Sequence, residues 1–229
     1  GEVTRITAAT PVLSPADQTG ELRNPWNADD RMDLYYSALG EWSTFAVDAQ
    51  SIGTETFEGA FTGRQAWKNN VRNHVFYGLV PGQSIAEREG ADPSAVAMTL
   101  PATQSHGAGY SAYMVSSAAA SVKPGEELKL EFEPALSLLE LDLSCEKNMT
   151  LKTLTLTVSG TSAGKGITGD YKIDVTDNSV NTRESTGEAV TLDFGETGLP
   201  MVTGQNYKAY AVVLPVRLEG KKFTFSGTT

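Results

Sequence analysis

The sequence predicts an all-β protein built from two β-sandwich domains in tandem, and three observations lead to this prediction. Short runs alternate apolar with polar residues at the period of two that is typical of half-buried strands. Clusters rich in Gly, Asn and Asp separate these runs, as turns require. No stretch has helical apolar spacing over enough length to demand a buried helix, although residues 14–22 and 43–51 could each hold a short turn.

The alternation is clearest in the C-terminal half. Seven runs at regular spacing predict a sandwich: Glu127–Phe132, Leu138–Leu143, Leu151–Val158, Tyr171–Val175, Ala189–Phe194, Tyr207–Leu214 and Phe223–Phe225. The turn-forming clusters between them include Gly160–Gly169, Asp177–Gly187 and Gly195–Gly204.

The N-terminal half is less regular and holds most of the aromatic residues. Its candidate strands are Arg31–Ser37, Thr54–Thr62, His74–Val80, Val96–Leu100 and Tyr113–Ser117. The small and polar segment Ala118–Glu127 contains a Pro-Gly pair and predicts a linker between the halves. We therefore expect an N-terminal domain over residues 1–122 and a C-terminal domain over residues 123–229.

Composition narrows the classes of function and the means of stabilisation. The 229 residues suffice for two domains that each bury a core. The net charge is −10, and no basic run interrupts the acidity, which argues against a nucleic-acid partner. The single Cys145 cannot close an internal disulfide, and its place at the end of a strand-like run favours a role in the core.

The N-terminal residues do not resemble a signal peptide, and no apolar run approaches the roughly 20 residues of a membrane-spanning helix. The chain therefore resembles a mature or trimmed protein. An export signal or a lipid-anchor cysteine could precede Gly1, and a membrane would be contacted only through such an anchor.

We find no set of residues that predicts catalysis. A Ser or Cys nucleophile needs a neighbouring base, and only His74 and His106 are available. His74 lies in a strand pattern, which favours a structural role, and His106 lies in a Gly-rich loop, where solvent exposure and a catalytic role are equally open. No GxSxG motif accompanies either residue, so the sequence does not predict an enzyme.

Cofactor and metal sites are not predicted either. The segment Gly160–Gly166 resembles a phosphate-binding loop only superficially, because its glycine spacing is short and no Ser or Thr follows the lysine. Two groups of carboxylates lack the spacing of a calcium loop and are expected to be solvated: Asp29, Asp30 and Asp33, and Asp174 with Asp177.

Two tryptophans are candidates for contact with a glycan. Most aromatic residues of the N-terminal half alternate with polar residues in strand patterns, and we expect these to fill a core. Trp42 and Trp67 lie in less regular surroundings, so they are the aromatic residues most worth testing for exposure.

Several segments occur in an order that resembles the fimbrillin-like family of Bacteroides-type bacteria, which comprises surface lipoproteins and pilus subunits. The segments are DRMDLYY (Asp30–Tyr36), HVFYGLVP (His74–Pro81), LPATQ (Leu100–Gln104), YMVSSA (Tyr113–Ala118), LKLEFEPALSLLELDLS (Leu128–Ser144), LKTLTLTVSG (Leu151–Gly160) and YAVVLPVRLEGKKFTF (Tyr210–Phe225). The resemblance spans nearly the whole chain, and the order of the segments carries more weight than any one of them.

The resemblance implies two tandem transthyretin-like β-sandwich domains, export as a lipoprotein, and display at the outer membrane or in a fimbria. In this family, a protease removes an N-terminal strand after a basic residue, and a strand from a neighbouring subunit fills the groove. Arg5 and Arg23 are the only basic residues among the first thirty, so each is a candidate processing position, with an ordinary exposed arginine as the alternative.

The resemblance also bears on the end of the chain. Relatives usually continue into one or two more strands beyond the position of KFTF. Either a tail follows Thr229, or the second sandwich is incomplete and accepts a strand from a partner.

Together these observations predict a structural or adhesive subunit of a cell-surface pilus, with other pilus subunits as partners through β-strand addition. The alternative is a carbohydrate-binding surface lipoprotein module, whose partners would be glycans or proteins of host or bacterial surfaces. Neither hypothesis calls for a cofactor.

Overall fold

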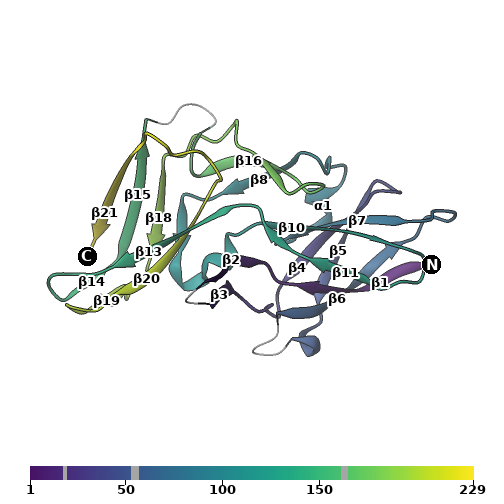
Figure 1. Ribbon diagram of the computed structural model, residues 1–229, viewed down its shortest axis with the longest axis horizontal. Helices are drawn as coiled ribbons and strands as arrows, with labels where there is room; N and C mark the ends of the chain where they lie inside the picture. Colours follow the sequence, from purple (N-terminus) through teal and green to yellow (C-terminus); the bar gives the residue numbers. More distant parts are fainter. Residues whose placement is uncertain (18–19, 53–56, 161–164) are drawn as a thin grey trace. The chain divides into compact units, whose positions relative to one another are not determined.

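The computed structural model describes residues 1–17, 20–52, 57–160 and 165–229, and the described chain is all-β, as predicted (Figure 1). Its residues divide into two compact units whose segments alternate along the sequence. Unit 1 comprises Gly1–Val96, Val115–Ala135 and Ile173–Ser179. Unit 2 comprises Ala97–Met114, Leu136–Lys172 and Val180–Thr229.

Unit 1 is built on one eight-stranded sheet in the order β11-β1-β6-β5-β4-β7-β10-β12. The strands are β1 (Glu2–Ala9), β4 (Arg31–Tyr36), β5 (Glu41–Val47), β6 (Glu58–Ala66), β7 (His74–Val80), β10 (Ser116–Val122), β11 (Leu128–Glu131) and β12 (Glu133–Pro134). Neighbouring strands are antiparallel except for β1 and β11, which are parallel.

This sheet curls round its own core. Its two end strands, β11 and β12, are separated in the sequence by Phe132 alone, so the ends of the sheet must lie together. Gly78 in β7 shows the same closure, because a Cβ there would lie 2.9 Å from both Leu130 Cδ1 and Phe132 Cζ. The enclosed core contains mostly aromatic and aliphatic side chains, among them Ile6, Met32, Leu34, Tyr36, Phe45, Phe61, Phe76 and Leu128.

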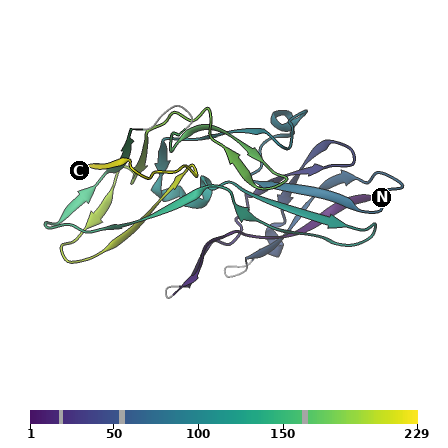
Figure 2. The same cartoon turned by 45° about the horizontal axis from the view of Figure 1, so that its top comes forward.

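Shorter elements complete unit 1. Strands β2 (Val12–Asp17) and β3 (Gly20–Arg23) pair only with each other and extend away from the sheet (Figure 2). A 3-10 segment, η1 (Ala49–Ser51), follows β5, and the single α-helix among the described residues is α1 (Ile85–Arg88).

A buried ion pair fixes α1 to the sheet. Asp33 in β4 is completely buried and accepts a 2.7 Å hydrogen bond from Arg88 Nε. Its carboxylate also accepts from the backbone N–H of Gln83 at 3.0 and 3.1 Å. A buried carboxylate is tolerated when it is paired and hydrogen-bonded in this way.

Unit 2 contains two strand pairs and one four-stranded sheet. β13 (Ser137–Leu143) pairs with β20 (Tyr207–Val213), and β14 (Met149–Leu151) pairs with β19 (Leu199–Met201). The sheet has the order β21-β15-β18-β9, with β21 (Lys222–Thr228), β15 (Thr153–Ser159), β18 (Ala189–Asp193) and β9 (Thr103–Ser105). Two 3-10 segments, η2 (His106–Ala108) and η3 (Tyr110–Ala112), follow β9. Three of the boundaries between units fall within β8 (Val96–Leu100), β16 (Gly169–Asp174) and β17 (Ser179–Asn181).

One sequence interpretation needs correction. The segment Ala118–Glu127 was expected to be a linker, but residues 118–122 belong to β10, where Ala118 and Val122 are buried. Small side chains there reflect close packing inside a curled sheet and not a mobile connection. The short turn that residues 43–51 could hold is present as η1 (Ala49–Ser51), after β5 ends at Val47.

The compact units also differ from the expected division at residue 122. Residues 128–134 belong to unit 1 because β11 pairs with β1 and β12 pairs with β10. The domain boundaries at 1–122 and 123–229 therefore stay a prediction, and the pairing of strands places part of the expected C-terminal domain in unit 1.

We expect Arg88→Leu to lower the free energy of unfolding by about 3–5 kcal/mol, because it leaves the Asp33 carboxylate buried without its cation. Urea unfolding would measure the change. Arg64→Leu is the matched control, since it removes the exposed Arg64–Glu2 pair and should cost no more than about 1 kcal/mol. Equal losses in the two variants would contradict this account of α1.

Candidate functional site

Strand β1 is hydrogen-bonded along both edges, although it is the first strand of the chain. Ile6 and Ala8 lie opposite Leu128 and Leu130 of parallel β11. The same two residues lie opposite Phe61 and Gly59 of antiparallel β6. Removing β1 would therefore expose two rows of backbone N–H and C=O groups, which another strand could satisfy.

The inward side chains of β1 fill three positions in the core of unit 1. Val3, Ile6 and Ala8 are all nearly or fully buried. Above Ala8, the Trp26 indole donates a 2.8 Å hydrogen bond to the Ala8 carbonyl oxygen. Gly59 permits this approach, because a Cβ there would lie 3.0 Å from Trp26 Cδ1. The groove that β1 fills thus has three buried positions, which hold the side chains of Val3, Ile6 and Ala8.

β1 was not predicted as a strand from the sequence. The reason is a register shift between Val3 and Arg5, which puts two residues instead of one between the buried positions Val3 and Ile6. The alternation that reveals other strands is broken at this point. The remaining signal, Ile6, Ala8 and Thr10 at a spacing of two, is too short to stand out.

The two candidate processing residues occupy different settings. Arg5 is exposed in the middle of β1, opposite Thr62 of β6. Arg23 ends β3, and residues 24–27 after it form no regular element. Arg23 donates from Nη2 to the Thr10 carbonyl oxygen at 2.8 Å and from Nε to Thr10 Oγ1 at 3.0 Å, with its guanidinium 4.9 Å from the centre of the Phe57 ring.

The two candidate glycan-contact residues also differ. Trp42 in β5 is only 9% exposed, its indole N–H donates to the Ala91 carbonyl oxygen at 3.0 Å, and its ring packs against Tyr35. Little of the Trp42 side chain is thus exposed, and its contact with a glycan stays a prediction. Trp67 is half-buried and lines a cavity.

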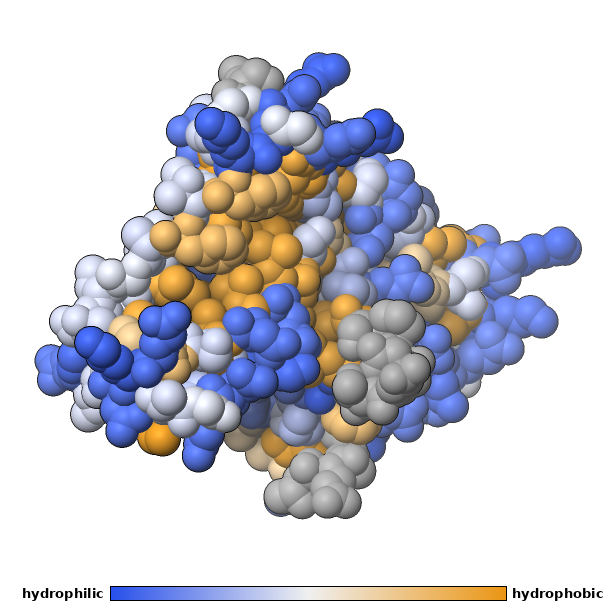
Figure 3. Space-filling view, turned by 60° about the vertical axis from the view of Figure 1, so that its left-hand side comes forward, coloured by the Kyte–Doolittle hydropathy of each residue, from blue (hydrophilic) through white to orange (hydrophobic). Residues whose placement is uncertain are grey.

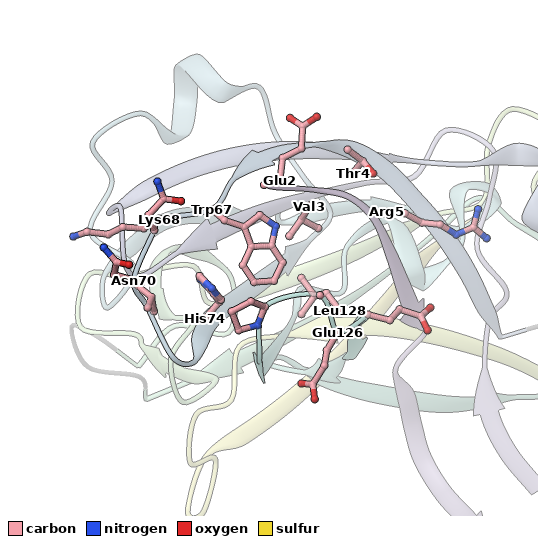
Figure 4. Close-up of a pocket in the computed structure, with 16 residues that line it drawn as sticks. Glu2, Val3, Thr4, Arg5, Trp67, Lys68, Asn70, His74, Glu126 and Leu128 are labelled. Carbon is pink, nitrogen blue, oxygen red and sulfur yellow. The ribbon is translucent and has the colours of Figure 1, made fainter.

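The Trp67 cavity lies at the start of β1 and has a volume of about 470 Å³. In Figure 4 the Trp67 ring occupies the centre, with Val3 and Leu128 beside it, while Glu2, Lys68 and Asn70 point outward. The backbone N–H of Trp67 donates to the Gly1 carbonyl oxygen at 2.9 Å. The N-terminal residues 1–5 supply one wall of the cavity.

His74 packs against the Trp67 ring and holds it in place. It is 1% exposed, its Nδ1 is hydrogen-bonded to the hydroxyl of Tyr36, and its ring lies 4.0 Å from the Trp67 ring in an edge-to-face arrangement. Burial lowers the pKa of His74 below its ordinary value of 6.5, which favours the neutral imidazole. These contacts give His74 the structural role that its strand pattern favoured.

The other residues considered for chemistry form no catalytic or metal-binding group in the described chain. His106 packs against Phe194, Asp30 accepts from the Asn27 backbone, and Asp177 accepts from Ser179. Among the described residues no three His, Cys, Asp or Glu side chains gather as metal ligands would. Cys145 is a half-buried free thiol beside the core of unit 2, and most of the Gly160–Gly166 segment lies outside the described residues.

Unit 2 presents an apolar surface (Figure 3), and its edge strand β21 is exposed. All seven residues of β21 are exposed, including Phe223 at 48% and Phe225 at 54%. These phenylalanines lie opposite the buried Val158 and Leu156 of β15, on the side of the sheet that faces the core. About half of each of these two residues thus remains exposed on the apolar side of the sheet.

Comparison with known proteins identifies the family of this chain. Residues 15–229 match the model of the fimbrillin-like family, so the chain belongs to that family, as the order of its motifs predicted. A search of the curated proteins found no match.

Two solved structures from Bacteroides ovatus ATCC 8483 are similar. A proposed cell adhesion protein has 12% sequence identity and a TM-score of 0.57, and the match covers 97% of this chain and 85% of that one. It supports the fold alone. A fimbrial protein has 12% identity and a TM-score of 0.38, with 95% of this chain and 46% of that one covered.

We expect the free energy of unfolding to fall as the pH decreases from about 7.5 to about 5.5, because the unfolded chain takes up a proton at His74 that the buried imidazole does not. Urea unfolding at several pH values would measure this. His74→Gln should remove part of the dependence, whereas the control His106→Gln, which leaves His74 in place, should retain that part. Equal behaviour of both variants would exclude His74 as the cause.

Proposed function

We propose that this protein is a subunit of a cell-surface pilus or adhesive fibre, and that it assembles by exchanging β1 for a strand of a neighbouring subunit. Membership of the fimbrillin-like family supports a pilus-type subunit. The observation that carries the finer proposal is the position of β1 between β11 and β6 in the eight-stranded sheet, where it is hydrogen-bonded along both edges.

The energetics favour exchange over simple loss of the strand. Burying a Val or Ile side chain contributes about 1.5–3 kcal/mol, so emptying the sockets of Val3 and Ile6 is costly. The exposed strand edges add unsatisfied backbone groups to this cost. A donated strand with apolar residues at the same positions restores both contributions, and the vacant groove therefore binds such a strand strongly.

Arg23 is the processing position that the fold favours. A cut after Arg23 frees residues 1–23, which include all of β1 together with the β2–β3 hairpin. A cut after Arg5 would leave residues 6–9 paired in the sheet, and Arg5 itself lies within a strand hydrogen-bonded on both sides, where a protease cannot bind an extended chain. The Arg23 side chain must first leave Thr10 and Phe57 to enter a protease pocket.

The family resemblance supplies the remaining parts of the proposal. The two domains would be transthyretin-like sandwiches, and the subunit would reach the outer membrane or a fimbria by a lipoprotein route. The partners are other pilus subunits. The similar structure of a proposed cell adhesion protein is in keeping with an adhesive role at the cell surface.

The apolar surface of unit 2 is a second place where subunits would meet. Strand β21 pairs only with β15, so its outer edge is open within the described chain. Large apolar side chains left exposed beside an open strand edge are typical of protein interaction sites.

Limited digestion with a trypsin-like protease tests the exchange of β1. We expect cleavage after Arg23, loss of residues 1–23, and polymers that survive mild heating in detergent. Arg23→Gln should prevent both cleavage and polymerisation, and Arg5→Gln should prevent neither. If polymers formed from chains that still carry residues 1–23, without a cut after Arg23, processing at Arg23 would be excluded. If cleaved protein stayed monomeric, strand exchange at β1 would be excluded.

We also expect the double substitution Phe223→Ser, Phe225→Ser to weaken self-association by at least about tenfold, because it removes the exposed apolar rings. Sedimentation at a series of concentrations would measure association. Thr224→Ser, Ser226→Thr is the control on the opposite side of β21. Unchanged association of the phenylalanine variant would remove this surface from the assembly.

A further inference from the structure

We propose that the Trp67 cavity binds a neutral sugar ring, such as the terminal residue of a glycan, and that it binds this sugar only while β1 occupies its place in the sheet. The binding site stands apart from the proposed function. Its coupling to β1 follows from the residues of β1 that line the cavity and would add regulation to that function.

The Trp67 ring is held as a rigid platform. It packs edge-to-face against His74 at 4.0 Å and against Phe76 at 6.0 Å, and both partners are buried in β7. The rest of the ring borders the cavity (Figure 4). A fixed aromatic surface suits the flat C–H face of a pyranose, because the ring loses little conformational freedom when the sugar stacks on it.

Hydrogen-bonding groups lie at the rim of the cavity. Asn69 and Asn70 are among its lining residues, and their exposed side-chain amides, of which that of Asn70 points outward in Figure 4, each offer donors and an acceptor. Within the described chain, no residue accepts a hydrogen bond from the Trp67 indole N–H, so that donor is available to a ligand. An apolar floor with a few polar groups at its edge is the usual composition of a small-molecule site.

The charges that line the cavity favour a neutral ligand. Arg5 and Lys68 oppose Glu2, Glu126 and Glu127, so neither sign dominates. Glu2 is already paired with Arg64, and the Glu127 carboxylate accepts from Thr7 Oγ1, which lowers the pKa of Glu127. The volume of about 470 Å³ lies within the range of small-molecule sites and accommodates one or two sugar rings.

Strand β1 is part of the site itself. Residues 1–5 make up five of the sixteen residues that line the cavity, and the Gly1 carbonyl oxygen is bonded to the backbone of Trp67. Departure of β1 would remove this wall. A ligand that binds only the intact site stabilises the state with β1 in place, so sugar binding and release of β1 oppose each other.

Nuclear magnetic resonance of the full chain tests the site. The three tryptophans give three indole N–H signals, and the probes are methyl α-mannopyranoside, methyl β-galactopyranoside and methyl β-N-acetylglucosaminide. At about ten millimolar, a site with a dissociation constant of about 1 mM is nine-tenths filled. We expect at least one sugar to shift the Trp67 signal in a saturable way and to leave those of Trp26 and Trp42 in place. No saturable shift with any probe overturns the proposal.

Variants then assign the contact, with affinity measured by calorimetry. Trp67→Phe keeps an aromatic ring against His74 and should weaken binding at least about fivefold, because the indole N–H is lost. The pair Asn69→Ala, Asn70→Gly should weaken binding similarly, with Gly chosen because Asn70 has a positive φ of 62°. Asn206→Ala, an exposed amide outside the cavity, is the control. Equal affinities in all variants would overturn the site.

Amide hydrogen exchange tests the coupling to β1. At a sugar concentration one hundred times the dissociation constant, exchange of the β1 amides that open by strand release should slow by about one hundredfold. Amides of β15 in unit 2 serve as the reference and should not slow. If the sugar bound without slowing amide exchange in β1, the coupling would be overturned and the binding site would still stand. Failure of polymerisation after cleavage at Arg23 would overturn the proposed function and leave both sugar results unaffected.

Discussion

The pairing of β1 on both of its edges is the constraint on which unit 1 depends. In the eight-stranded sheet, β1 fills the place between β11 and β6. Without a strand there, the core of unit 1 would lose the buried side chains of Val3, Ile6 and Ala8, and both neighbouring strands would lose their hydrogen-bonding partner on that side.

The strand edges of unit 2 are arranged differently. Within its described residues, β21 and β13 each pair with a single strand, and the half-exposed Phe223 and Phe225 lie beside one of these edges. In unit 1, by contrast, the two end strands β11 and β12 lie together beside the core. A pilus-type subunit must be stable and must also present a surface to which the next subunit can add.

The sequence predicted most of the strands but not the way they combine. Strands such as β8 and β18 were found because their alternation is unbroken, and the buried faces follow directly from it. β1 was missed because a register shift interrupts its alternation, and Ala118–Val122 was taken for a linker because alanines in a tightly curled sheet look like a flexible segment. Trp42 and Trp67 could not be told apart by sequence, since their exposure depends on Ala91 and on residues 1–5, which are distant along the chain.

The separation of β1 from β11 in the sequence has a consequence for how the protein acquires its structure. Ile6 pairs with Leu128, so β1 and β11 cannot pair until the residues up to Leu128 are available. Contacts between such distant residues slow folding, because a long loop must close before the contacts can stabilise the chain. A chain that emerges from a ribosome or a translocation pore N-terminus first would therefore carry one edge of β1 without its partner until β11 follows, and during that time this edge is open to chaperones and to the strands of other chains.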